Sequence, residues 1–68
     1  MKPLTPREVE GYLKANGYVF DHATGSHMIW WNGTTGHSVA VPRHGNRTMR
    51  QGTLLSIFKS CGITPPRR

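Results

Sequence analysis

The chain has 68 residues, of which 35% are hydrophobic, and its nine Lys and Arg residues against three Asp and Glu residues give a net charge of +6. This size allows one modest core, and no apolar run approaches the roughly 20 residues of a membrane span. A single cysteine, Cys61, excludes an intrachain disulfide. We therefore expect one soluble, cytoplasmic domain over residues 1–68, with no membrane segment.

The charges are distributed unevenly. The last acidic residue is Asp21, and from His22 to Arg68 every charged residue is Lys or Arg, with four histidines interspersed. A surface of one sign attracts polyanions, so nucleic acid is the expected partner class. Two-metal nucleases and glycosidases need clustered carboxylates, which this part of the chain lacks. Imidazole, hydroxyl and guanidinium groups remain, and these suit a metal-independent ribonuclease or a protein that binds nucleic acid without cleaving it.

The first predicted element is a helix over residues 6–16. Thr5 and Glu8 form a capping box, and Pro6 takes the first helical position. Asn16-Gly17 supplies a left-handed stop. Leu4 would form a hydrophobic staple with Val9. Apolar residues at helical spacing would face the core: Val9, Tyr12 and Leu13.

Three β-rich runs separated by turn formers then predict an antiparallel meander. Centred on Thr34, the second hairpin would pair Ile29 with Val39 and Trp31 with His37. Apolar residues occupy both faces of the second strand, so we expect one of its two tryptophans to end near solvent. The predicted strands are residues 18–20, 27–31 and 37–41, with turns at 22–26 and 32–36.

A basic connection over residues 43–50 leads to a second amphipathic helix over residues 51–61, with Gly62 as its C-cap and Ile63 making the hydrophobic contact that accompanies such a cap. Residues 64–68 form a tail that cannot bury itself. The predicted fold is α+β with the order α-β-β-β-α. A three-stranded antiparallel sheet would carry both helices on one face, as in double-stranded RNA-binding domains.

Three sequence segments carry a family resemblance: Gly25-Ser26-His27, the run over residues 39–46, and the run over residues 52–63. On these segments, in this order and spacing, the chain resembles the HicA-type toxins of bacterial toxin–antitoxin pairs over nearly its whole length. The resemblance implies an mRNA interferase with a fold like that of double-stranded RNA-binding domains, and a HicB-like antitoxin as partner. Thr24 departs from the basic or amide residue common in the family, which could alter phosphate contacts.

The resemblance places the family's catalytic histidine on His27. Chemistry is consistent with that role, because an imidazole with a pKa of about 6.5 exchanges protons near neutral pH. RNA carries its own nucleophile, the 2′-hydroxyl, so one positioned base could start cleavage without a metal. The alternative is that His27 opens a strand and makes a structural hydrogen bond.

The remaining candidates would bind RNA. Gly25 and Ser26 would let the backbone approach a phosphate, or they form an ordinary tight turn. His44 would be a second proton-transfer group or a cap at the strand end. Three arginines are candidates for phosphate contacts or for stabilising the charged transition state, with solvated side chains as the alternative: Arg43, Arg47 and Arg50.

Other residues receive no functional role. His22 and His37 lie outside any motif and are expected at the surface. The spacing of the histidines and Cys61 matches no ligand pattern, so we expect neither a metal site nor a cofactor. Cys61 fits the apolar face of the second helix. Trp30 or Trp31 could stack on an unpaired base, although packing within the hairpin is the commoner role for a strand tryptophan.

Three functions fit these observations. The first is a type II toxin that cleaves mRNA as an endoribonuclease, with His27 as the acid–base residue. The second is a non-catalytic RNA-binding module, and the third is a basic protein that binds an acidic protein partner. His27 within Gly-Ser-His favours the first, because a pure RNA binder needs Arg or Lys at such a position rather than imidazole.

Overall fold

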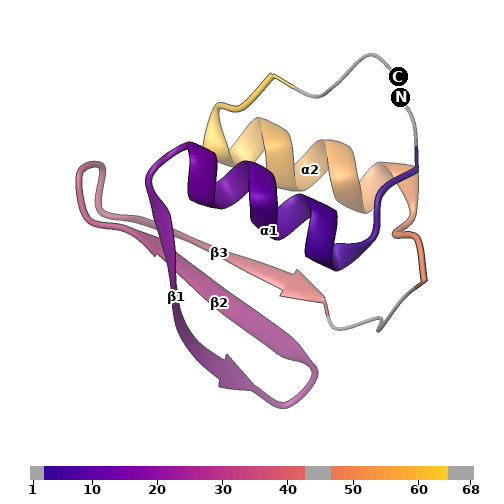
Figure 1. Ribbon diagram of the computed structural model, residues 1–68, viewed down its shortest axis with the longest axis horizontal. Helices are drawn as coiled ribbons and strands as arrows, with labels where there is room; N and C mark the ends of the chain where they lie inside the picture. The colour runs from indigo at the N-terminus through magenta and orange to yellow at the C-terminus, as the bar shows by residue number, and fades with distance from the viewer. Residues whose placement is uncertain (1–2, 43–46, 65–68) are drawn as a thin grey trace.

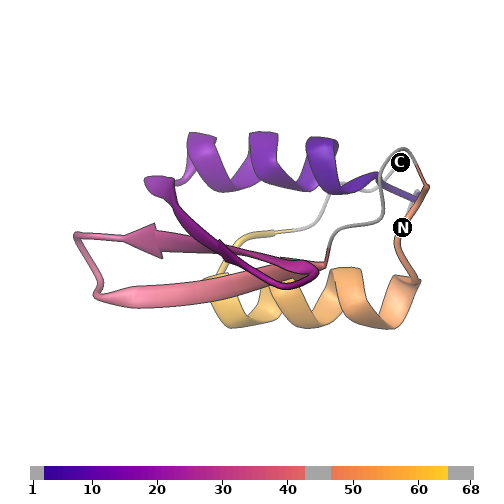
Figure 2. The ribbon, with the colours of Figure 1, turned by 90° about the horizontal axis from the view of Figure 1, so that it is seen from below.

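The structure is a computed structural model that describes residues 3–42 and 47–64. It contains a three-stranded antiparallel sheet in the order β1-β2-β3, with both helices on one of its faces (Figure 1). α1 packs against β1, and α2 packs against β3 (Figure 2). The elements are α1 (Pro6–Ala15), β1 (Tyr18–Thr24), β2 (His27–Asn32), β3 (His37–Pro42) and α2 (Gln51–Cys61). The predicted fold class, element order and helix placement are confirmed.

Both helices begin and end where their local signals predicted, to within one residue. In α1, the Thr5 side chain accepts a hydrogen bond from the Glu8 N–H, and the Glu8 carboxylate accepts one from the Thr5 N–H at 2.9 Å. Asn16 follows the last helical residue as the C-cap. At the end of α2, Gly62 adopts the left-handed conformation, and the Ile63 N–H donates to the Phe58 carbonyl at 2.9 Å, as in a Schellman motif.

The prediction for the first strand was too short, because β1 continues from Phe20 through Thr24. The turn-prone residues after Phe20 pair with β2 instead of forming a loop, since the ladder satisfies their backbone groups. A β-bulge at Asp21 shifts the register between Phe20 and His22. One extra residue in β1 therefore reverses which of the following side chains face the helices.

The predicted register of the second hairpin was wrong by one residue. Trp31 pairs with Ser38, and Asn32 pairs with His37, so Asn32 belongs to β2 and the loop has four residues. The Asn32 side-chain oxygen accepts hydrogen bonds from the N–H groups of Thr34 at 2.9 Å and Thr35 at 3.3 Å. Asn32 is buried and organises the loop, an arrangement that turn propensity alone does not reveal.

This register decides the faces of the sheet. Trp30 is 3% exposed and faces the helices, whereas Trp31 is 40% exposed and faces the other way, as expected for one of the two tryptophans. Met49 joins the core from the connection before α2, where its N–H donates to the Leu4 carbonyl at 2.8 Å. The buried core comprises Leu4, Val9, Leu13, Tyr18, Trp30, Val39, Val41, Met49, Leu54, Ile57, Phe58 and Ile63.

His37 was expected at the surface without a role, and the structure shows it only partly exposed and hydrogen-bonded. Its ring is partly buried, with Nδ1 2.7 Å from the Tyr18 hydroxyl and Nε2 3.1 Å from the Ser60 hydroxyl. Burial, with a smaller contribution from Cys61, raises the pKa of Tyr18 to about 12. His37 thus joins β1, β3 and α2 through a chain of polar contacts.

Candidate active site

The Gly25-Ser26-His27 motif forms a tight turn at one end of the sheet. Thr24 pairs directly with His27, which leaves Gly25 and Ser26 as the two turn residues. Gly25 has a positive φ of 55°, and a Cβ added there would meet no atom within 4 Å. The backbone conformation, rather than lack of space, therefore requires glycine. Of the turn predicted over residues 22–26, only Gly25 and Ser26 form a turn, because His22 to Thr24 pair with β2.

His27 is the first residue of β2 and is exposed. It lies between Thr24 on β1 and Pro42 on β3, on the sheet face that carries no helix. Within residues 3–42 and 47–64, no side chain forms a hydrogen bond with its imidazole. The alternative of a structural hydrogen bond thus finds no partner among these residues, and both ring nitrogens are available to a ligand.

A second histidine shares this face. His22 pairs with Ile29 and lies diagonally across from His27, an arrangement that in sheets typically places side chains about 7–8 Å apart. Its Nδ1 atom is 2.8 Å from the Asp21 carboxylate, and both side chains are more than half exposed. Without the bulge at Asp21, strict alternation from Phe20 would turn His22 toward the helices. A single-residue bulge is not readable from the sequence, which explains why His22 received no role.

The centre of the same face is apolar. Val19 pairs with Trp31 across β1 and β2, and their exposed fractions are 58% and 40%. Ile29 and Ala40 pair beside them across β2 and β3. We call the nine outward positions of the three strands the open face: Val19, His22, Thr24, His27, Ile29, Trp31, Ser38, Ala40 and Pro42. It offers imidazole, hydroxyl and aromatic groups without a covering layer.

The predicted basic residues occupy different places. Arg43 and His44 lie outside the described residues, but they follow Pro42, which pairs with His27. Arg47 and Arg50 are exposed on the segment over residues 47–50 that leads into α2 (Figure 1). Arg50 is the N-cap residue of α2 and makes no side-chain capping bond. The described structure therefore brings Gly25, Ser26 and His27 together in one turn, and places Arg47 and Arg50 in the helix layer.

Other classes of site can be examined in the same described residues. Residues 3–42 and 47–64 contain no group of three His, Cys, Asp or Glu side chains placed to hold a metal ion. Cys61 is partly buried at the end of α2, where burial raises the pKa of its thiol. None of the helices in this part of the chain is long and apolar enough to cross a membrane. The site offers acid–base chemistry by imidazole beside hydroxyl groups and an apolar surface.

Comparison with known protein families gives one match. Residues 6–63 match the family described as the HicA toxin of bacterial toxin–antitoxin systems. The match runs from the first residue of α1 to beyond the end of α2, so it includes every helix and strand of the structure. No curated protein matches the chain.

Proposed function

The chain belongs to the HicA toxin family of bacterial toxin–antitoxin systems, and on that basis we propose that it is an endoribonuclease that cleaves mRNA without a metal, using His27 as the acid–base residue. The observation that carries this proposal is the exposed His27 imidazole on the Gly25-Ser26 turn, which makes no hydrogen bond within the described residues. An imidazole that makes no hydrogen bond to the surrounding structure has both ring nitrogens available for proton transfer.

The proposed reaction uses the nucleophile that RNA supplies. Neutral His27 takes the proton from a 2′-hydroxyl, and the 2′-oxygen attacks the adjacent phosphorus. The bond from phosphorus to the 5′-oxygen of the next nucleotide breaks, and that oxygen leaves with a proton from an acid. The products are a 2′,3′-cyclic phosphate and a free 5′-hydroxyl. DNA lacks the 2′-hydroxyl, so it would be bound without being cut.

Two histidines are candidates for the acid that protonates the leaving oxygen. His44, which the sequence suggested as a second proton-transfer group or a strand-end cap, follows the strand that pairs with His27. His22 shares the open face with His27, and its Nδ1 atom contacts the Asp21 carboxylate at 2.8 Å. Arg43, Arg47 and Arg50 would bind phosphates and neutralise the transition-state charge.

Membership in a toxin family implies an antitoxin that neutralises this chain. We expect a HicB-like protein with acidic residues that covers His27 and at least part of the Gly25–His27 turn, because this blocks access to the acid–base residue. The basic side chains Arg43, Arg47 and Arg50 would pair with it. An antitoxin that bound only the helices and left His27 accessible to RNA would contradict this model of inhibition.

Cleavage of single-stranded RNA by purified protein in the presence of EDTA tests the function. Cleavage should proceed and yield 2′,3′-cyclic phosphate ends, because the chain has only three carboxylates and none in the Gly-Ser-His motif. An absolute requirement for Mg²⁺ or Zn²⁺ would contradict the proposal. RNA binding without cleavage would instead support the RNA-binding module, provided that affinity falls steeply with salt as phosphate contacts require. No RNA affinity at all would leave the third function, a basic protein that binds an acidic protein partner.

A further inference from the structure

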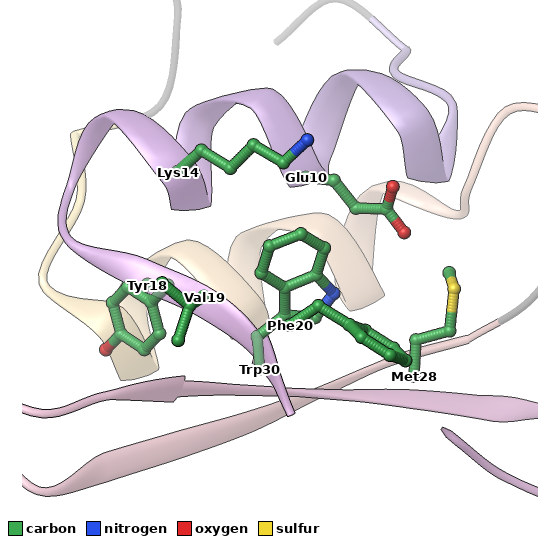
Figure 3. Close-up of a pocket in the computed structure, with 7 residues that line it drawn as sticks. All are labelled: Glu10, Lys14, Tyr18, Val19, Phe20, Met28 and Trp30. Atoms are coloured by element: carbon green, nitrogen blue, oxygen red, sulfur yellow. The ribbon is translucent and has the colours of Figure 1, made fainter. Parts of the chain in front are cut away.

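A pocket lies on the helix side of the sheet, on the opposite face of β2 from His27. It is formed between α1 and β1, and its volume is about 520 Å³ (Figure 3). This is within the range of roughly 300–1,000 Å³ that is usual for small-ligand sites. We call it the α1–β1 pocket and define it by five of its lining residues: Glu10, Lys14, Phe20, Met28 and Trp30.

The indole N–H of Trp30 has no hydrogen-bond partner within residues 3–42 and 47–64. Trp30 is 3% exposed, and its Nε1 atom is fully covered. Leaving such a donor buried and unpaired is costly, so native structures pair nearly all of them. Figure 3 shows this nitrogen on the side of the pocket where Glu10 and Met28 lie. A ligand that carries an acceptor at its inner edge would satisfy the indole N–H once the atoms that cover this nitrogen move aside.

The mouth of the pocket presents an aromatic ring. Phe20 is 52% exposed, although it packs edge-on against Trp30 with ring centroids 5.9 Å apart. An exposed phenylalanine next to a hollow offers an apolar face on which a flat ring can stack. Proteins that bind unpaired RNA use aromatic side chains in this way.

Two charged groups from α1 frame the pocket. The partly buried Glu10 carboxylate makes no hydrogen bond or ion pair within residues 3–42 and 47–64. The Lys14 ammonium lies 5.8 Å from the centroid of the Trp30 ring. The Glu10 carboxylate repels a phosphate but accepts hydrogen bonds from N–H groups. The Lys14 ammonium attracts a phosphate bound near the mouth of the pocket. The occupant is therefore a neutral ring with N–H donors that is joined to a phosphate.

We propose that the α1–β1 pocket binds an unpaired guanine base of the RNA substrate, an inference that rests on the proposed ribonuclease function. Guanine is flat, its O6 atom accepts the Trp30 N–H, and its N1–H and N2–H groups together can donate to the Glu10 carboxylate. Adenine presents its unprotonated N1 atom to that carboxylate, which is repulsive. An apolar peptide side chain would leave both Trp30 and Glu10 without a partner.

The position of β1 makes such a contact compatible with cleavage at His27. β1 is an edge strand of the described sheet, and Tyr18, Val19 and Phe20 of this strand line the α1–β1 pocket. Neighbouring strands are about 4.8 Å apart, so RNA that passes around β1 can reach both sides of the sheet within a few nucleotides. The pocket would then select a guanine near the cleaved bond.

Binding of guanosine 5′-monophosphate tests the proposal without requiring cleavage. His27→Ala keeps the protein inactive, and Trp31→Phe leaves Trp30 as the only tryptophan, so its fluorescence reports on the pocket. We expect saturable binding that is stronger for guanosine 5′-monophosphate than for adenosine 5′-monophosphate. Glu10→Gln should lower the guanosine affinity about tenfold, as for loss of a bidentate base contact. Asp21→Asn, which removes a carboxylate outside the pocket, should leave it unchanged.

A second pair of variants tests the stacking contact. Phe20→Ala should weaken guanosine binding, whereas Leu55→Ala, which truncates an exposed apolar residue on α2, should not. Equal effects in variant and control, or no saturable binding, would overturn the pocket assignment. A Phe20→Ala protein that binds guanosine normally but has lost affinity for its antitoxin would also overturn the pocket assignment, because the pocket would then be a protein-binding site. Guanosine binding by a wild-type protein that cuts no RNA would contradict the ribonuclease function alone.

Discussion

His27 and His37 lie in the same sheet, but their surroundings differ. His27 is exposed at the start of β2, and its imidazole has no hydrogen-bond partner among the described residues. His37 opens β3, is partly buried, and places both ring nitrogens against the hydroxyls of Tyr18 and Ser60. Both residues are histidines at the start of a strand, so residue type and position do not distinguish them. Their hydrogen bonds do, because a ring without partners can exchange protons with a ligand, whereas a ring with two partners stabilises the fold.

The largest expected effect follows from replacing His27. His27→Ala should lower the rate of RNA cleavage by about 10²–10⁴-fold, because a positioned acid–base group contributes on that order. RNA affinity and Tm should change little, since the side chain buries no core area and several arginines supply phosphate affinity. All three quantities should be measured on one preparation. Retained cleavage would move the chemistry to another residue, and a large drop in Tm would make His27 structural.

Alkaline titration probes the contacts around His37. Because the folded pKa of Tyr18, about 12, is above its unfolded value of 10.0, the folded state retains the proton more strongly. Stability should be intact below pH 10 and should fall as the pH rises from 10 toward 12, by up to about 2–3 kcal/mol. Denaturant unfolding at several pH values measures this. Tyr18→Phe should reduce the slope, and an identical slope in that variant would assign the effect to other groups.

Replacing His37 should give the reverse of the His27 result. His37→Ala removes the hydrogen bonds that the ring makes with the Tyr18 and Ser60 hydroxyls, and the free energy of unfolding should fall by about 1–2 kcal/mol. Cleavage per folded molecule should stay near the wild-type rate. If His37→Ala abolished cleavage while Tm was unchanged, the two histidines would have been assigned the wrong roles.

The smallest expected effect concerns His22. His22→Ala should slow cleavage by roughly tenfold if His22 is the acid that protonates the leaving oxygen. His44→Ala serves as the matched comparison. Slower cleavage in His44→Ala but not in His22→Ala would instead assign the acid to His44.

Features encoded over short distances were predictable from the sequence. The capping box of Thr5 and Glu8, and the left-handed Gly62, are local signals, so both helices were predicted to within one residue. His27 was found through its motif. The strand details depend on contacts across the sheet. The bulge at Asp21 and the bonds of Asn32 to its loop set which residues pair, and neither has a local signature.

The same reason explains the residues that were missed. His22 reaches the open face only because of the bulge, and His37 is held by Tyr18 and Ser60, which are far away in the sequence. The α1–β1 pocket combines Glu10 from a helix with Trp30 from the central strand. A periodic pattern assigns a residue to a face of its own element, but it does not identify which face of another element will lie opposite.

The bulge at Asp21 also bears on how copies of this protein avoid one another. An open sheet leaves the outer backbone of β1 unpaired, and Val19 and Phe20 on that strand are apolar and largely exposed. Such an edge can pair with the edge of another molecule and start aggregation. A bulge bends the strand, and the Asp21 carboxylate adds a charge to it. The irregularity that turns His22 outward therefore also makes this edge a poorer template for pairing with another molecule.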